Sequence, residues 1–269
     1  SLVAKSLLST LHSEIGEARF TMLETLREFG VERLAIEGER QEVHDRHAAY
    51  FLQEALDGEY AWCMYIDEGR MWLNRLQVDH ANLREALQWL YDSGEITTCL
   101  RMAGALTALW ILRGHHREGQ VWLERLLADH RMDSDAVRAR GLTILSWISN
   151  QQDRVDKAFA LAEEAITLSR DLDMPLIAIG AHVLSGIAAR ELGRHTLAKQ
   201  RIEDALAHML ALDEPDWLGN HAQNTLVILG DIQLLDGDVD AAEERFQQAW
   251  NTDLSRGYEP GTSFIYSNA

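Results

Sequence analysis

The second half of the chain repeats an amphipathic phrase of about forty residues. Each copy has two stretches in which apolar residues recur at three- and four-residue steps, as on one face of an α-helix, with a short polar turn between them. The small residues that follow each turn lie 39, 40 and 44 residues apart: Gly119, Ala158, Ala198 and Ala242. A recurring helix pair predicts a solenoid, in which neighbouring pairs bury a continuous core and expose an extended binding surface.

Small residues also mark where the two helices of a pair must come close. Ser146, Gly186 and Gly230 hold this position in successive copies, so we expect the second helix to pack directly on them. The second copy has Asp153 near its turn, where a side chain tolerates a positive φ less well. The other turns contain a glycine, which adopts positive φ readily: Gly114, Gly193 and Gly237.

Residues 1–38 follow a different pattern. Residues 2–8 read as the end of a helix that runs into a strand, and residues 9–11 and 19–22 are expected to pair as a hairpin around the polar residues 13–17. A helix with an apolar stripe follows, and Gly38 ends it. Helix, hairpin and helix in this order predict the C-terminal part of a winged-helix domain.

Residues 39–95 are predicted to be a helical linker without a repeat, and residues 96–269 to hold the repeats, the last of them truncated. In the linker, Asp79 is positioned as the N-cap of a helix over residues 81–91, which residues 92–94 end. The expected fold is therefore mainly α: an α-solenoid of about four helix pairs, preceded by a short β-hairpin.

Composition agrees with a helical protein and excludes several functions. The 269 residues include only 3 prolines, and 46% are hydrophobic, which is enough for one or two domains with a sizeable core. A formal charge of −18 argues against a nucleic-acid-binding face. The 2 cysteines are far apart, as is usual in a reducing cytosol, and no apolar stretch is long enough to span a bilayer. We therefore expect a cytoplasmic protein with no direct contact to nucleic acid or membrane.

The helix pairs resemble tetratricopeptide repeats of the long variant. The preceding segment resembles a junction found in STAND-class, NB-ARC-like ATPases, in particular bacterial transcriptional regulators of the type associated with LuxR and SARP domains. The resemblance rests on the sequences Ser-Leu-Leu at 6–8, Arg-Phe-Thr-Met-Leu-Glu-Thr-Leu-Arg-Glu-Phe at 19–29 and Glu-Arg-Leu at 32–34. Two linker sequences also match, at residues 47–51 and 79–87.

This resemblance implies a regulatory arm. In such regulators an upstream ATPase head switches between states, and the repeat arm senses an inducer or a protein partner and restrains or releases that head. The chain itself contains no Gly-x-x-x-x-Gly-Lys-Ser/Thr loop, so it is not expected to bind or hydrolyse ATP. ATP and magnesium are expected only in a head domain outside this sequence, and the chain is expected to be a fragment of a larger protein. The alternative is a free-standing adaptor that docks a partner's peptide.

The candidate binding residues follow from the repeat register. In a tetratricopeptide pair the first helix lines the concave side, and this register turns Trp147 toward it. Aromatic, basic and amide side chains on such a wall can hold a peptide or a small polar ligand, although exposed groove residues often bind nothing. The predicted set is Arg140, Thr143, Trp147, Asn150, Arg190, Glu191, Asn224 and Asp231.

Other constellations favour structural roles. His44, Asp45 and His47 share a helix but offer too few ligands for zinc, and no metal site is predicted. The Ser, His and Asp residues are scattered, and no Gly-x-Ser-x-Gly nucleophile elbow is present in the sequence. No catalytic residue is therefore predicted, and an enzyme is the least favoured class of protein. Five tryptophans fall on or near apolar stripes and are predicted to lie in the core: Trp72, Trp89, Trp110, Trp122 and Trp250.

Overall fold

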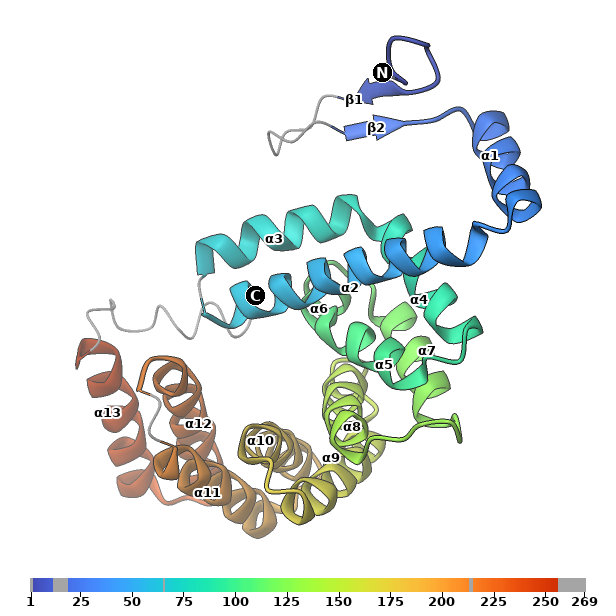
Figure 1. Ribbon diagram of the computed structural model, residues 1–269. Coiled ribbons are helices and arrows are strands. Elements are labelled where there is room, and N and C mark those ends of the chain that lie inside the picture. The colour runs from blue at the N-terminus through green and yellow to red at the C-terminus, as the bar shows by residue number, and fades with distance from the viewer. Residues whose placement is uncertain (1, 12–18, 65, 213–214, 256–269) are drawn as a thin grey trace. The chain divides into compact units, whose positions relative to one another are not determined.

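A computed structural model describes residues 2–11, 19–64, 66–212 and 215–255. Thirteen helices and one two-stranded hairpin are formed by these residues, and the chain divides into two units, residues 1–95 and 96–269 (Figure 1). The predicted mainly helical class and the hairpin are thus confirmed. The two units are described one at a time.

The first unit begins with the predicted hairpin. Strands β1 (Ser9–Leu11) and β2 (Arg19–Thr21) pair antiparallel with Ser9 opposite Thr21, while the expected turn at 13–17 lies outside the described residues. Residues 2–6 form hydrogen-bonded turns, in which the amide of Leu7 donates to the Leu2 carbonyl and that of Ser6 to the Val3 carbonyl, and Ser6 has a φ of 57°. This is the backbone arrangement that ends a helix, and it leads into β1 as the sequence predicts. Helix α1 (Glu24–Glu37) ends at Gly38, whose φ of 75° makes the left-handed cap that glycine permits.

Three helices form the core of the first unit. They are α2 (Arg40–Met64), α3 (Ile66–Val78) and α4 (His80–Asp92). Helix α2 packs against both α3 and α4, and Ala48, Ala55, Leu83 and Leu87 are almost completely buried. Asp79 precedes α4 as expected, but its carboxylate accepts a hydrogen bond from the Asn82 side chain rather than from a backbone amide of the first turn.

The described residues of the second unit form four successive helix pairs. The first helix of the first pair is interrupted at Leu106, which separates α5 from α6. The helices are α5 (Ile96–Ala105), α6 (Thr107–Leu112), α7 (His116–Leu127), α8 (Asp135–Asn150), α9 (Val155–Asp171), α10 (Pro175–Glu191), α11 (His195–Ala211), α12 (Pro215–Leu235) and α13 (Val239–Ser255). Helices α8, α10 and α12 are the first members of their pairs, and α9, α11 and α13 the second. Each first helix packs on its own partner and on the second helix of the preceding pair.

The turns within the pairs have the backbone that their sequences indicate. Gly114, Gly193 and Gly237 have φ values of 75°, 71° and 82°, in the left-handed region. Asp153 takes the same conformation at 57°, although it carries a Cβ. The turn therefore keeps the same geometry without glycine, and the left-handed backbone of Asp153 is strained.

The predicted close approaches are also present. A Cβ added at Gly230 would lie 2.6 Å from the Phe246 ring, because α13 packs on the bare backbone of α12. Gly186 stands in the same relation to Ile202, at 2.6 Å. In the second pair this position is Ser146, whose hydroxyl donates a hydrogen bond to the Ala158 carbonyl at 2.7 Å. A serine is accepted there because its buried hydroxyl has an acceptor on the facing helix.

No helix among the described residues is long and apolar enough to cross a membrane. Of the tryptophans predicted to lie in the core, Trp110 is completely buried and its indole nitrogen donates to the Ala103 carbonyl at 2.9 Å. Trp72, Trp89 and Trp122 are partly buried. Trp250 is 51% exposed, so its predicted place in the core is wrong. Its apolar stripe is real, but no described helix covers that end of it.

Candidate recognition surface

Trp147 is the most prominent of the predicted binding residues. It lies in the C-terminal half of α8, on a first helix, and 40% of it is exposed although both of its neighbours are buried. An exposed indole presents a flat apolar face and one hydrogen-bond donor, which suits a peptide or a planar ligand. The structure therefore leaves this side chain accessible to solvent.

Three of the predicted residues come together where α10 meets α12. The Arg190 guanidinium lies 3.8 Å from the Asp231 carboxylate and 3.9 Å from that of Glu191. At these distances the groups form ion pairs, but they are too far apart for direct hydrogen bonds. The N–H donors of Arg190 therefore remain available to a further group. Burial raises the pKa of Asp231, and the charge of Arg190 acts in the opposite direction.

Four predicted residues are less available. The side-chain oxygens of Asn150 and Asn224 are buried and accept no hydrogen bond from a described residue, so these two atoms do not face solvent although both residues are partly exposed. The Thr143 hydroxyl donates to the Ala139 carbonyl at 2.9 Å, and its methyl group lies against α10. Arg140 rests on the backbone of Gly104 in α5. The structure thus separates an accessible group, formed by Trp147, Arg190, Glu191 and Asp231, from supporting residues.

A polar network links three helices and escaped the sequence reasoning. Glu163 of α9 accepts two hydrogen bonds from Arg201 of α11, at 2.8 and 2.7 Å, and one from Ser185 of α10, at 2.6 Å. Burial alone would raise the pKa of Glu163, but these hydrogen bonds outweigh it and lower the pKa. The three residues are 22 and 38 positions apart, so only the packing of successive pairs brings them together.

His182 of α10 lies beside this network. It is almost completely buried, with Nδ1 3.7 Å from the carboxylate of Asp204 and its ring centroid 5.6 Å from that of His208. Burial lowers the pKa of His182 to about 4; Asp204 opposes that shift, and Arg201 adds to it. The imidazole is therefore neutral at physiological pH, and it lies beside the charged pair that Glu163 forms with Arg201.

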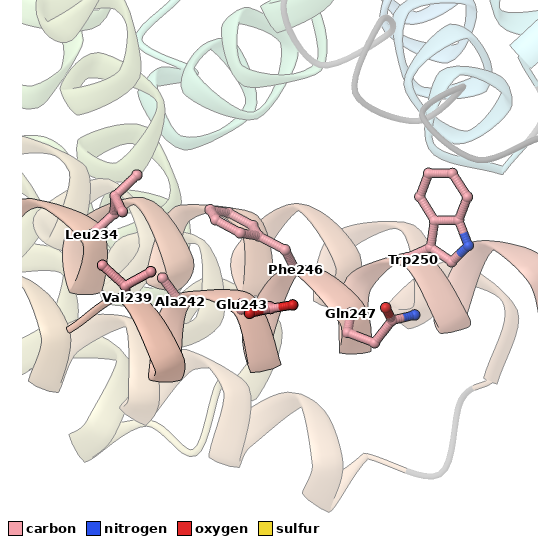
Figure 2. Close-up of a pocket in the computed structure, with 7 residues that line it drawn as sticks. All are labelled: Leu234, Val239, Ala242, Glu243, Phe246, Gln247 and Trp250. Carbon is pink, nitrogen blue, oxygen red and sulfur yellow. The ribbon is translucent and has the colours of Figure 1, made fainter.

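A second missed feature is an apolar surface on the last helix pair, here called the terminal apolar surface. Figure 2 shows its side chains, with Leu234, Phe246 and Trp250 pointing to the same side of the pair. They border a recess of about 280 Å³, and Glu243 and Gln247 supply its polar edge. The surface comprises Leu234, Val239, Ala242, Phe246 and Trp250. The amphipathic stripe of α13 predicts this apolar face, but apolar spacing does not show whether another helix covers it.

In the first unit, the histidines considered as metal ligands make packing contacts. The His44 ring stacks on Trp89 with centroids 4.4 Å apart, and the Trp89 indole donates to the Asp45 carboxylate at 2.8 Å. His47 packs against Phe51, and burial lowers its pKa. The contacts of His44 and Asp45 with Trp89 join α2 to α4. The contact of His47 with Phe51 lies within α2.

Comparison with known proteins agrees with the helical repeats. No protein-family model matches the chain. Among solved structures, BtubC from P. vanneervenii has a TM-score of 0.60 at 17% identity and covers 81% of this chain and 94% of its own. A kinesin light chain from Podosopora anserina with TPR-like repeats has a TM-score of 0.51 at 15% identity, covering 69% and 92%. These likenesses show the fold: the second unit is a tetratricopeptide-like α-solenoid.

Sequence relatives point to a regulatory protein. Proteins of Mycobacterium bovis and Mycobacterium tuberculosis that bear the name HTH-type transcriptional regulator are 31% identical over 196 residues, or 70% of this chain. The chain spans 22% of the length of these relatives. The chain is therefore similar to one part of a much longer regulator.

Proposed function

We propose that this chain is the sensor and regulatory arm of a STAND-class, NB-ARC-like signalling ATPase that regulates transcription. A protein partner or small-molecule inducer binds the first-helix face of the repeats and controls an upstream ATPase head. The observation that carries the proposal is the accessible group on that face, with the exposed Trp147 and the incompletely paired Arg190. The regulator names of the curated relatives support it.

The chemistry of this face suits a ligand with both flat and charged parts. Trp147 offers stacking or apolar contact, and the guanidinium of Arg190 can bind a carboxylate or phosphate group. Glu191 and Asp231 favour a ligand that also carries a positive charge or hydrogen-bond donors. A peptide or a zwitterionic metabolite meets both requirements.

Control of the head requires that the ligand bind one state of the protein better than the other, because a ligand shifts an equilibrium only by its differential affinity. The chain contains no phosphate-binding loop, so its own part in the mechanism is recognition and not hydrolysis.

ATP hydrolysis by the complete gene product tests this proposal. We expect the rate to change when residues 96–269 are deleted, and to respond to the double variant Trp147→Ala with Arg190→Ala. The control variant Val121→Ala removes an exposed apolar side chain from α7 and should leave the rate unchanged. Absence of ATP hydrolysis from the complete protein would refute the ATPase context and favour the free-standing adaptor.

A further inference from the structure

Charged side chains are unevenly distributed along the first-helix face of the repeats. Arg101 of α5 and Arg140 of α8 lie in the first two pairs, and they are here called the basic end. Glu191 of α10 and Asp231 of α12 lie in the last two pairs, and they are called the acidic end. A ligand that extends along this face therefore meets positive charge at one end and carboxylates at the other.

The basic end combines side chains from two first helices that pack against each other, α5 and α8. Arg140 reaches across to α5 and lies over Gly104, where a Cβ would be 3.7 Å from its Nε and 3.9 Å from its Cζ. Arg101 precedes Gly104 by three residues and therefore shares its side of α5. Its side chain is exposed, although Leu100 and Met102 are buried. Two guanidinium groups on one side of the helices suit a carboxylate.

The acidic end holds two carboxylates beside one guanidinium. Arg190 lies 3.9 Å from the carboxylate of Glu191 and 3.8 Å from that of Asp231, so these three groups together carry one negative charge in excess. Glu191 is exposed, and the Asp231 side chain is 47% exposed. A cationic side chain of a ligand can therefore approach both carboxylates from solvent, with a favourable electrostatic interaction.

Apolar side chains occupy the middle of the face. Trp147 lies two helical turns beyond Arg140 on α8, and Ile187 lies one turn before Arg190 on α10. Trp147 is 40% exposed and Ile187 is partly exposed. The middle of a bound ligand therefore contacts an indole ring and an aliphatic side chain, which favour apolar groups.

The separation of the two ends limits the size of the ligand. Helices α8 and α10 pack against each other, which corresponds to about 9 Å between their axes. Glu191 lies 11 residues beyond Gly180, the position that corresponds to Arg140 when Gly186 is aligned with Ser146. This offset is about 16 Å along the helix, so the backbones of Arg140 and Glu191 are roughly 19 Å apart. An extended peptide covers that distance in about six residues, whereas a single amino acid is too short.

We propose that the first-helix face binds an extended peptide segment that has an acidic residue at one end, apolar residues in the middle and a basic residue at the other end. The acidic side chain pairs with Arg101 and Arg140, and the basic side chain pairs with Glu191 and Asp231. This inference rests on the function proposed above and narrows its ligand from a peptide or zwitterionic metabolite to a peptide of defined charge order. The basis is charge complementarity over a fixed distance.

Synthetic peptides test this arrangement. The probe is Glu-Ser-Phe-Ser-Leu-Ser-Lys with blocked termini, in which the charged and apolar side chains alternate with serine and share one face of an extended chain. The same sequence in reverse order is tested as well, since the charges of the face are compatible with either chain direction. The tripeptide Glu-Phe-Lys, also blocked, is the control for length. Binding to the 269-residue chain is measured by fluorescence anisotropy.

Two variants reverse one charge at each end of the face, both at exposed residues: Arg101→Glu and Glu191→Lys. Arg117→Glu, at an exposed residue of the second helix α7, is the matched control. We expect one order of the probe to bind the parent chain and Arg117→Glu, and to bind the two other variants at least about tenfold more weakly. A probe with Lys in place of its Glu should bind Arg101→Glu again, and one with Glu in place of its Lys should bind Glu191→Lys again.

Three results would overturn the proposal: no binding of either order to the parent chain, equal binding of the tripeptide, or no recovery of binding with the exchanged probes. The test is separate from that of the proposed function. Peptide binding by a chain whose residues 96–269 have no effect on ATP hydrolysis would refute the proposed function alone. Control of hydrolysis without peptide binding would refute this inference alone.

Discussion

Gly186 in α10 lies directly against Ile202 in α11, so that a Cβ at Gly186 would be 2.6 Å from Ile202 Cδ1 and 3.3 Å from the carbonyl oxygen of Ala198. The missing side chain is what allows the two helices of this pair to touch. The same relation joins Gly230 to Phe246 in the next pair.

Alanine at Gly186 should therefore destabilise the chain. The added methyl group must displace the buried Ile202, which costs about 1–3 kcal/mol in the free energy of unfolding. Gly180→Ala, in the same helix, is the matched control: its Cβ would meet only the Thr143 methyl, at 3.4 Å. That change should be neutral or stabilising by up to ~1 kcal/mol through helix propensity. Urea unfolding followed by circular dichroism measures both, and equal effects would contradict the close approach.

The turn at Asp153 offers a stabilising substitution. Its φ of 57° lies in the left-handed region, which glycine adopts in the three corresponding turns. Asp153→Gly should raise the free energy of unfolding by about 0.5–1 kcal/mol, since relief of the left-handed strain exceeds the entropy that glycine adds to the unfolded chain. Gly193→Ala should lower the free energy of unfolding by about 1–2 kcal/mol, because it introduces a Cβ at a left-handed position. A loss of stability in Asp153→Gly would show that the Asp153 side chain contributes more than its backbone costs.

The inter-pair network should depend on Glu163 far more than on its neighbour. Glu163 accepts three hydrogen bonds and is partly buried, whereas Glu164 makes one contact with Arg138, at 2.9 Å, and is more exposed. We expect Glu163→Gln to cost about 1–3 kcal/mol of stability and Glu164→Gln less than about 0.5 kcal/mol. Thermal unfolding of both variants at neutral pH checks this, and similar losses would refute the assigned network.

Stability should also fall in mild acid because of His182. Its pKa is about 4 in the folded chain and about 6.5 when unfolded, so between these values the unfolded state binds more protons. The free energy of unfolding therefore decreases as the pH falls from 6.5 toward 4, by about 3 kcal/mol at most. His182→Phe removes this titration. Its stability should vary less than that of the parent over this range, and an unchanged pH profile would contradict the buried neutral ring.

The sequence predicts most of the repeat region because the features that define it are local. Apolar spacing, the turn glycines and the small residues at Ser146, Gly186 and Gly230 all report on contacts within one pair, and the structure confirms each. Contacts between pairs are harder to predict. Glu163, Ser185 and Arg201 are ordinary polar residues on helix faces until three helices bring them together.

Trp250 shows a second limit. Its stripe correctly identifies which side of α13 is apolar, but periodicity cannot tell whether another helix covers that side. The repeat register predicts that Trp147 faces the concave side of the repeats, and the structure leaves its side chain 40% exposed. Whether its face binds a ligand depends on the partner, which leaves no pattern in this chain.

Photo-crosslinking tests most directly whether the first-helix face binds a partner or an inducer. A benzoylphenylalanine at position 147 replaces one aromatic side chain with another, and a second protein carries the probe at Val121, exposed on α7. After irradiation in living cells, mass spectrometry detects protein or small-molecule adducts. We expect one adduct specific to position 147 that Arg190→Ala abolishes. The same adducts at both positions, or none at 147, would contradict recognition by this face.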